Sequence, residues 1–173
     1  MPSVLFVCTA NRFRSPLAAA IFKKALTEEE NHRTTPWNVG KASTWEVGSA
    51  GTWAMPGEPV LPDVLEAAKQ IGIDLSRHRS QRVNGSLLSE YDLIVVMQES
   101  HKEALQSEFP DLEEHIYLFS RVVDLGSYDI LDAYGSFQEV LGVTAGMNEL
   151  IRRNLRYLCV LAISLHNKRY SSK

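Results

Sequence analysis

Short apolar runs alternate along the chain with longer stretches in which apolar residues recur at helical spacing. Each run has the length and the β-branched or aromatic character of a strand buried on both faces, which is typical of parallel sheets. The four runs cover residues 4–7, 45–47, 93–97 and 116–119. The pattern therefore predicts four short strands.

In the stretches that follow these runs, apolar residues recur at the spacing of one helical face. We expect helices at residues 15–28, 62–71, 100–109 and 136–166, the last interrupted near Gly142 to Gly146. Ser15 before Pro16 indicates an N-cap, and Ser100 with Glu103 indicates a capping box. Strands that alternate with helices predict an α/β fold, a four-stranded parallel open sheet with helices on both faces. We find no repeat or dividing linker, so we expect a single domain over residues 1–173.

Composition narrows the class of protein. The chain has 173 residues, 45% of them hydrophobic, and a net charge of −3, so we expect a packed core and no nucleic-acid partner. The longest uncharged apolar run, residues 157–165, is shorter than the roughly 20 residues that span a bilayer, so we expect no membrane partner. Two cysteines, Cys8 and Cys159, form no disulfide framework and favour the cytoplasm.

The turn after the first strand carries the clearest chemical pattern. It reads CTANRFRS from Cys8 to Ser15, with five residues between the cysteine and Arg14 and a helix beginning at once. In open parallel sheets, ligands bind beyond the carboxyl ends of the strands. Backbone N–H groups in such a turn, with the positive end of a helix dipole, form a concave site for an anion.

The same field stabilises a thiolate. Cys8 would have a lowered pKa in this position, and Arg14 could form two parallel hydrogen bonds to phosphate oxygens. A thiolate beneath a bound tetrahedral anion can attack phosphorus. Alternatively, Cys8 is a small core residue and Arg14 a surface charge; the strand–turn–helix context favours the phosphate site.

Residues 4–22, VLFVCTANRFRSPLAAAIF, resemble the phosphate-binding loop and first helix of the low-molecular-weight protein tyrosine phosphatases. The resemblance continues through residues 48–52, residues 72–75 with His78, and residues 93–97 followed by His101. It implies a four-stranded parallel sheet and a phosphorylated protein as substrate. No metal or cofactor is expected, and the protein is expected to be a monomer or a weak homodimer.

The family also uses an aspartic acid, in an Asp-Pro-Tyr or similar turn before the last helix. Asp132, followed by Ala133 and Tyr134, resembles this general acid. Chemistry requires one, because an alkoxide or phenoxide leaves phosphorus slowly unless its oxygen is protonated. Asp129 is the second candidate and Asp124 the third.

The resemblance assigns roles to further residues. The residues expected to line the phosphate site are Thr9, Ala10, Asn11, Arg12, Phe13 and Ser15. Asn11 resembles the residue that holds the loop in shape, and Ser15 resembles the hydroxyl that bonds the thiolate, although a plain N-cap has the same sequence. Trp53 and Tyr134 resemble aromatic walls of the cleft; Trp53 could equally cover an edge of the core.

Three loop residues depart from the family pattern. Ala10 stands where glycine is usual, so its backbone must avoid the left-handed region. Arg12 replaces an aliphatic residue or, in protein-arginine phosphatases, a threonine, and we expect it at the cleft rim, where it could pair with an acidic residue beside a phosphotyrosine. Phe13 replaces a second cysteine.

We interpret the chain as a protein tyrosine phosphatase in which Cys8 attacks, Arg14 and the loop hold the phosphoryl oxygens, and Asp132 protonates the leaving group. A protein-arginine phosphatase would use the same residues. An arsenate reductase would need further cysteines near the site, and only Cys159 remains. A non-catalytic phosphate-binding module is a fourth possibility, which turnover of p-nitrophenyl phosphate would exclude.

Overall fold

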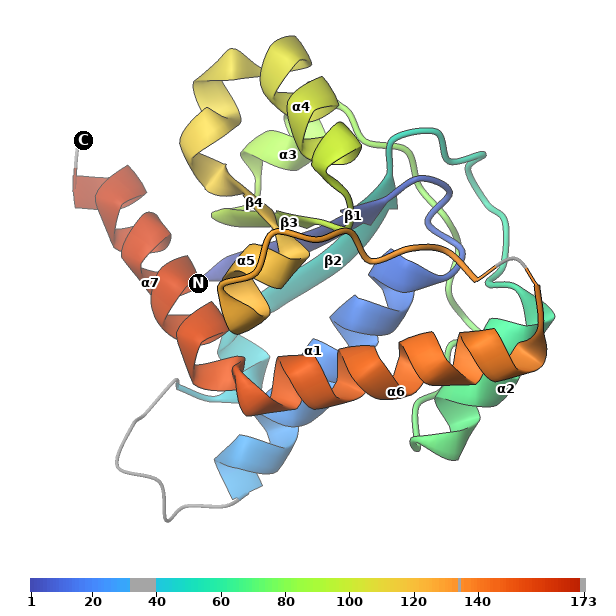
Figure 1. The fold of residues 1–173 in the computed structure, drawn as a ribbon. Helices are drawn as coiled ribbons and strands as arrows, with labels where there is room; N and C mark the ends of the chain where they lie inside the picture. Colours follow the sequence, from blue (N-terminus) through green and yellow to red (C-terminus); the bar gives the residue numbers. More distant parts are fainter. Residues whose placement is uncertain (32–39, 134, 172–173) are drawn as a thin grey trace.

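A computed structural model describes residues 1–31, 40–133 and 135–171 of the chain. Its four strands form one all-parallel sheet in the order β2-β1-β3-β4 (Figure 1). The strands are β1 (Ser3–Cys8), β2 (Glu46–Gly51), β3 (Leu93–Val96) and β4 (Ile116–Leu118). The predicted four-stranded parallel sheet is confirmed. Since all carboxyl ends meet at one edge, the segments that follow β1, β2 and β3 converge there.

Helices cover both faces of the sheet, as predicted. Figure 1 shows α3 (Gly85–Ser89) and α4 (Glu99–Glu108) on one face. The other helices are α1 (Arg14–Asn31), α2 (Pro62–Gln70), α5 (Phe119–Asp124), α6 (Phe137–Arg153) and α7 (Leu155–Ser171). Of these, α1, α5 and α6 lie below the sheet in Figure 1. Two 3-10 turns, Ala42–Thr44 and Pro110–His115, complete the elements of the described residues.

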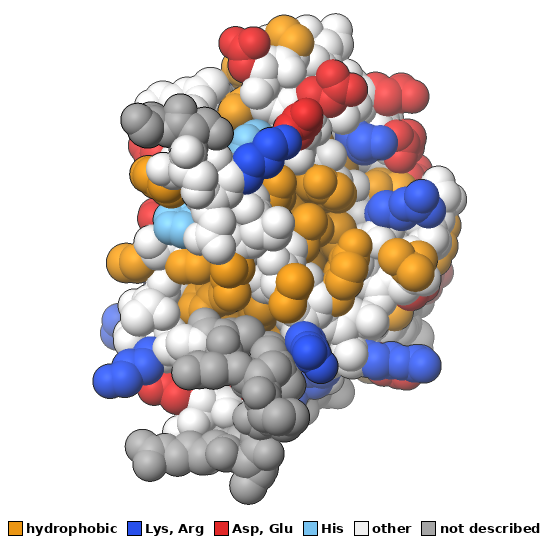
Figure 2. Space-filling model, turned by 90° about the vertical axis from the view of Figure 1, so that its left-hand side faces the viewer, with side chains coloured by type: hydrophobic (Ala, Val, Ile, Leu, Met, Phe, Trp, Pro, Cys, Tyr) orange, Lys and Arg blue, Asp and Glu red, His pale blue; other side chains and the backbone are white. Residues whose placement is uncertain are grey.

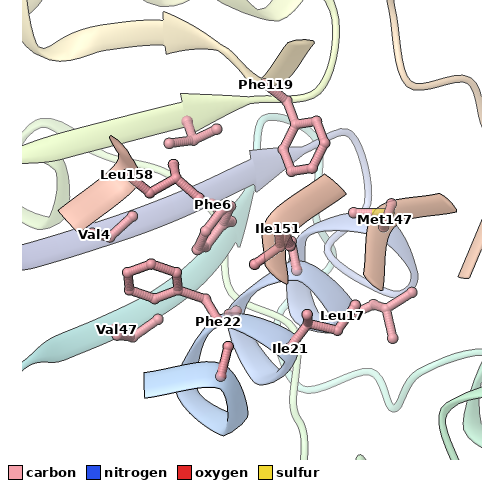
Figure 3. Close-up of a cluster of buried hydrophobic side chains, with 14 of the residues drawn as sticks. Val4, Phe6, Leu17, Ile21, Phe22, Val47, Phe119, Met147, Ile151 and Leu158 are labelled. Atoms are coloured by element: carbon pink, nitrogen blue, oxygen red, sulfur yellow. The ribbon is translucent and has the colours of Figure 1, made fainter. Parts of the chain in front are cut away.

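Alternate residues of β1 supply two separate cores. Val4 and Phe6 point into the larger cluster with α1 and α6, where the Phe6 and Phe22 rings lie 5.9 Å apart (Figure 3). Leu5 and Val7 point into the smaller cluster on the other face. Burial of each such side chain stabilises the fold by about 1.5–3 kcal/mol. The strand that ends at Cys8 is therefore anchored on both sides.

Two predicted helix starts are wrong. α1 begins at Arg14, one residue before Ser15, and the Ser15 hydroxyl bonds to Ala50 O instead of capping the helix. α4 begins at Glu99, so Ser100 lies inside it. The cap of α4 comes from a distant segment, since Asp129 Oδ1 accepts a hydrogen bond from Glu99 N at 2.8 Å. Sequence spacing cannot reveal a cap that arrives from another loop.

The predicted interruption near Gly142 is also wrong. α6 runs through both glycines and ends at Arg153, and the side-chain amide of the C-cap residue Asn154 donates to Leu150 O at 3.0 Å. Each glycine costs a helix about 1 kcal/mol. The helix persists because Val140, Met147 and Ile151 are buried in the larger core, where α6 packs against α1, α2 and α5, and this burial outweighs that cost.

α7 follows at once and forms one side of the molecule. On the face where α7 lies, hydrophobic side chains gather at the surface (Figure 2), and α7 itself exposes Tyr157, Val160 and Tyr170. None of the helices in the described ranges has the length and hydropathy needed to cross a membrane.

Candidate active site

The loop from Cys8 to Ser15 turns its backbone carbonyls outward. The carbonyl oxygens of Cys8, Thr9 and Arg12 accept hydrogen bonds of 2.9–3.1 Å from the backbone N–H groups of Thr52, Trp53 and Leu61. The described residues contain no cis peptide bond, and in a trans peptide the N–H points opposite to the carbonyl. The N–H groups that follow these carbonyls therefore point to the inner side of the loop, as an anion site requires.

Asn11 holds the loop in shape. Its φ of 56° lies in the left-handed region, which asparagine tolerates. Its side-chain amide donates to Ser15 Oγ and Ser49 Oγ, both at 2.9 Å, and its Oδ1 accepts from Gln81 N at 2.9 Å. His78 Nε2 donates to the Asn11 carbonyl at 2.7 Å. Burial lowers the pKa of His78, which keeps this ring neutral.

Ala10 has no left-handed backbone conformation. Among the described residues, Asn11 and Leu125 are the only non-glycine residues with positive φ. Ala10 therefore has an ordinary backbone conformation, as expected from its sequence. Phe13 differs from expectation: its side chain is buried in the larger core, so only its backbone can face a bound phosphate.

Cys8 is nearly buried and its Sγ lies 3.0 Å from Ser15 Oγ. The Ser15 hydroxyl has one proton, which it donates to Ala50 O at 3.1 Å while it accepts from Asn11. Once Cys8 is a thiolate, the same proton can turn to sulfur. Ser15 can therefore stabilise the reactive form of Cys8 through a charge-assisted hydrogen bond.

Arg14 is 1% exposed, and its guanidinium is the point at which distant segments meet. Nη1 donates to Gln98 Oε1 at 2.9 Å and to Ile130 O at 2.7 Å, while Nη2 donates to Thr9 Oγ1 at 3.3 Å and pairs with Asp132. Its Nε is buried without a hydrogen-bond partner among the described residues. A buried donor without a partner is costly, and a bound oxyanion would satisfy it.

Of the three candidate acids, Asp132 alone lies against Arg14. Asp129 is engaged in the cap of α4, and Asp124 bonds to Gly126 N and to the Tyr128 hydroxyl. The loop that carries Asp132 is fixed by Ile130, whose N–H donates to Met97 O at 2.8 Å. The geometry therefore brings Asp132 together with Arg14, beside the Cys8–Ser15 loop.

Sequence reasoning missed Gln98 as a site residue and gave His101 no role. Gln98 bonds to Arg14, and His101 Nε2 lies 2.9 Å from Thr9 Oγ1. Both follow the carboxyl end of β3, which neighbours β1 in the sheet. That position is the signal that could have found them, because residues after adjacent parallel strands share one edge.

Two predicted site residues lie at the surface. Arg12 Nε donates to Pro59 O at 2.8 Å, and its Nη1 lies 3.8 Å from Glu58 Oε2. Contacts within the protein therefore already engage the Arg12 guanidinium and partly neutralise its charge. Trp53 is 75% exposed, and the Arg82 guanidinium carbon lies 5.4 Å from its ring centroid. Tyr134, the other predicted wall, lies outside the described residues.

The donor set suits an oxyanion. Within the described ranges, no group of three or more His, Cys, Asp or Glu side chains is placed to hold a metal ion. The thiol, the hydroxyls of Thr9 and Ser15, and the Arg14 guanidinium can bind and attack a phosphoryl group, and the Asp132 carboxyl can transfer a proton.

Comparison with known proteins agrees with this chemistry. Residues 3–160 match the family described as low molecular weight phosphotyrosine protein phosphatase. A probable low molecular weight protein-tyrosine-phosphatase, EpsP, from Ralstonia nicotianae is 33% identical over 143 residues, 80% of this chain and 86% of the relative. A protein-arginine-phosphatase from Bacillus subtilis is 30% identical over 156 residues, 90% of this chain and 95% of the relative.

Similarity also extends to three dimensions. The crystal structure of a YwlE mutant from Bacillus subtilis superimposes with a TM-score of 0.79 at 29% sequence identity, covering 91% of this chain and 99% of that one. The sheet order, the loop after β1 and the whole-chain match lead to one assignment. The chain belongs to the low molecular weight phosphotyrosine protein phosphatase family.

Proposed function

We propose that this protein hydrolyses phosphotyrosine in phosphorylated proteins through a phosphocysteine intermediate. The observation that supports this most is the meeting of Cys8, Arg14 and Asp132 at one edge of the sheet, with a buried Arg14 Nε that has no partner among the described residues. We place the activity in the cytoplasm, where both cysteines, which are free thiols, stay reduced.

In the first step, the Cys8 thiolate attacks phosphorus. The sulfur–phosphorus bond forms, the bond to the tyrosine oxygen breaks, and Asp132 gives its proton to that oxygen. In the second step, water attacks phosphorus, its proton goes to Asp132, and the thiolate leaves as phosphate forms. Arg14 and the loop N–H groups hold the non-bridging oxygens throughout.

The ion pair between Asp132 and Arg14 adds a step before this chemistry. The phosphoryl group and the Asp132 carboxylate are both anions that bind the same guanidinium. Substrate binding therefore displaces the Asp132 carboxylate from Arg14. Once this carboxylate has taken up a proton from water, its carboxyl group can protonate the leaving oxygen.

A protein-arginine phosphatase is the second candidate, supported by the similarity to the Bacillus subtilis enzyme. Arg12 opposes it in part, because a guanidinium there would repel the cationic guanidino group of phosphoarginine, while Glu58, 3.8 Å away, offsets part of this charge. An arsenate reductase is less well supported. Cys159 is fully buried in α7, and burial raises its pKa to about 12, so it cannot serve as a second reactive thiol.

Turnover of phosphotyrosine and phosphoarginine peptides, measured side by side, tests this proposal. We expect hydrolysis of phosphotyrosine, and we expect Cys8→Ser to abolish it while inorganic phosphate still binds, because a serine hydroxyl ionises far less readily than a thiol. Activity on phosphoarginine alone would favour the second candidate. Near wild-type turnover in the Cys8→Ser protein would exclude the cysteine mechanism.

A further inference from the structure

His101 is a buried histidine of α4, and its ring makes one hydrogen bond among the described residues. Its Nε2 lies 2.9 Å from Thr9 Oγ1, and the side of the ring that carries Nδ1 is buried with no partner among the described residues. The same Thr9 oxygen accepts from Arg14 Nη2 at 3.3 Å. His101 is thus linked to Arg14 through a single hydroxyl group.

The ring is neutral at physiological pH. Burial, with a further contribution from the Arg14 charge, lowers the pKa of His101 to about 4. A neutral imidazole carries one proton, on either Nδ1 or Nε2. The surroundings of the two nitrogens decide which.

The two tautomers differ in what they leave unpaired. With the proton on Nδ1, a buried N–H donor has no acceptor among the residues that the structure describes, and folded proteins rarely tolerate such a donor. With the proton on Nε2, the N–H donates to Thr9 Oγ1, and Nδ1 keeps only an unused lone pair. The second arrangement is the less costly one.

A threonine hydroxyl accepts two hydrogen bonds and donates one. Arg14 fills one acceptor position of Thr9 Oγ1, and the Nε2–H of His101 fills the second. The hydroxyl proton is then free for a third partner. Thr9 lies beside the guanidinium that the proposed function assigns to phosphoryl binding, so a phosphoryl oxygen is a suitable third partner.

We propose that His101 is a positioning residue, which donates from Nε2 to Thr9 and so orients the Thr9 hydroxyl proton toward the bound phosphoryl group. The inference rests on the proposed function for its substrate. The tautomer of His101 and the affinity for inorganic phosphate can both be measured without any turnover.

Nitrogen-15 NMR of the histidine side chains tests the tautomer directly. In phosphate-free wild-type protein at neutral pH, we expect His101 Nε2 to be protonated and Nδ1 to be unprotonated. A His101→Gln sample identifies the resonances. A proton on Nδ1 would overturn the proposal.

Calorimetric titration with inorganic phosphate tests the consequence. We expect Thr9→Val to weaken phosphate binding by about 10- to 100-fold, the usual effect of losing a hydrogen bond to a charged group. His101→Leu should weaken it by a smaller factor. The double variant should bind no more weakly than Thr9→Val alone, because His101 acts only through that hydroxyl.

Two further variants separate positioning from general damage. His101→Gln keeps a side-chain N–H donor and should restore phosphate binding to within about twofold of wild type. His115→Leu removes a histidine that bonds to Asp92 O, away from the loop, and should leave phosphate binding unchanged.

The results that would overturn the positioning role of His101 differ from those that would overturn the proposed phosphatase function. Additive losses in the double variant, or a His101→Gln protein as weak as His101→Leu, would show that His101 does not act through Thr9. Absence of phosphotyrosine turnover with these binding results intact would instead overturn the proposed function. If His101→Leu unfolds, the NMR result and Thr9→Val still decide.

Discussion

Four groups converge on the Arg14 guanidinium, and in the proposed mechanism one of them, the Asp132 carboxylate, is displaced by the substrate. Gln98, Ile130 O and Thr9 are neutral acceptors that hold the guanidinium plane. Asp132 is charged and partly exposed, with 19% of its side chain accessible against 1% for Arg14. It is therefore the partner that solvent can most easily stabilise when it moves.

Asp132→Asn should separate two roles of this carboxyl. We expect turnover of phosphotyrosine to fall by roughly 10²–10⁴, the usual contribution of a general acid. We also expect inorganic phosphate to bind severalfold more tightly, because no carboxylate competes for Arg14. Steady-state kinetics and calorimetric titration measure the two effects.

Asp129→Asn is the matched control, since Asp129 caps α4 and does not touch Arg14. Its amide oxygen still accepts from Glu99 N, so we expect near-normal turnover. If Asp129→Asn lost turnover and Asp132→Asn kept it, the general acid would be Asp129 and not Asp132. Unchanged phosphate affinity in Asp132→Asn would contradict the competition.

The residues that the sequence could and could not identify differ in where their contacts come from. Cys8, Arg14 and Ser15 lie within one turn, so spacing and a strand before a helix were sufficient to find them. The family resemblance identifies Asn11 as well, but its contacts with Ser49 and Gln81 span separations that no local pattern encodes. The contact of His101 with Thr9 spans such a separation too. Such contacts exist only once the sheet has aligned its strand ends.

At the scale of elements, the end of β2 supports the loop that follows β1. Gly51 pairs with Cys8, and a Cβ on Gly51 would lie 2.4 Å from Thr9 O and 2.9 Å from Asn11 N. No side chain fits there without moving the loop backbone. The two strand ends therefore approach closely because residue 51 is glycine.

Gly51→Ala should displace the Cys8–Ser15 loop. We expect the free energy of unfolding to fall by about 1–3 kcal/mol, as in other overpacked sites, and kcat/KM for phosphotyrosine to fall at least roughly tenfold because the N–H groups move. Thermal unfolding and steady-state kinetics measure both changes.

Gly142→Ala offers a control of the same chemical size. A Cβ at Gly142 meets nothing within 4 Å, so alanine should stabilise α6 by up to about 1 kcal/mol and leave activity unchanged. Equal effects of the two substitutions would show that the close approach at Gly51 is unimportant.

The type of an element could be predicted from the sequence where burial of apolar side chains determines it. The buried runs at β1 and β3 are strands, as predicted, because both faces of the sheet are covered. The helix boundaries were less predictable. α4 takes its cap from Asp129 and α6 continues through two glycines, since contacts from elsewhere in the chain outweigh the local preference.

At the scale of the whole molecule, His101 makes stability depend on pH. Its pKa is about 4 in the folded protein, where Arg14, Asp132 and Asp129 are the charged groups around it, and about 6.5 when unfolded. Below about pH 6.5 the unfolded chain takes up the proton first. The folded state therefore loses up to about 3 kcal/mol between pH 6.5 and 4, and nothing from this group above pH 6.5.

Urea unfolding at pH 7, 6, 5 and 4.5 should show this loss in wild type, and a smaller loss in His101→Gln, which has no titrating ring. The carboxylates titrate in both proteins and cancel in the comparison. Parallel pH curves for the two proteins would contradict the assignment of this loss to His101.

The order of the strands also has a consequence for synthesis on the ribosome. β1 precedes β2 and β3 in the chain, yet it lies between them in the sheet, and Asp132 is made 118 residues after Arg14. The Cys8 thiol is therefore synthesised long before the segments that enclose it in the folded protein. The proposed nucleophile is therefore synthesised well before its proposed proton donor, so that the full proposed catalytic set exists only once the chain extends beyond Asp132.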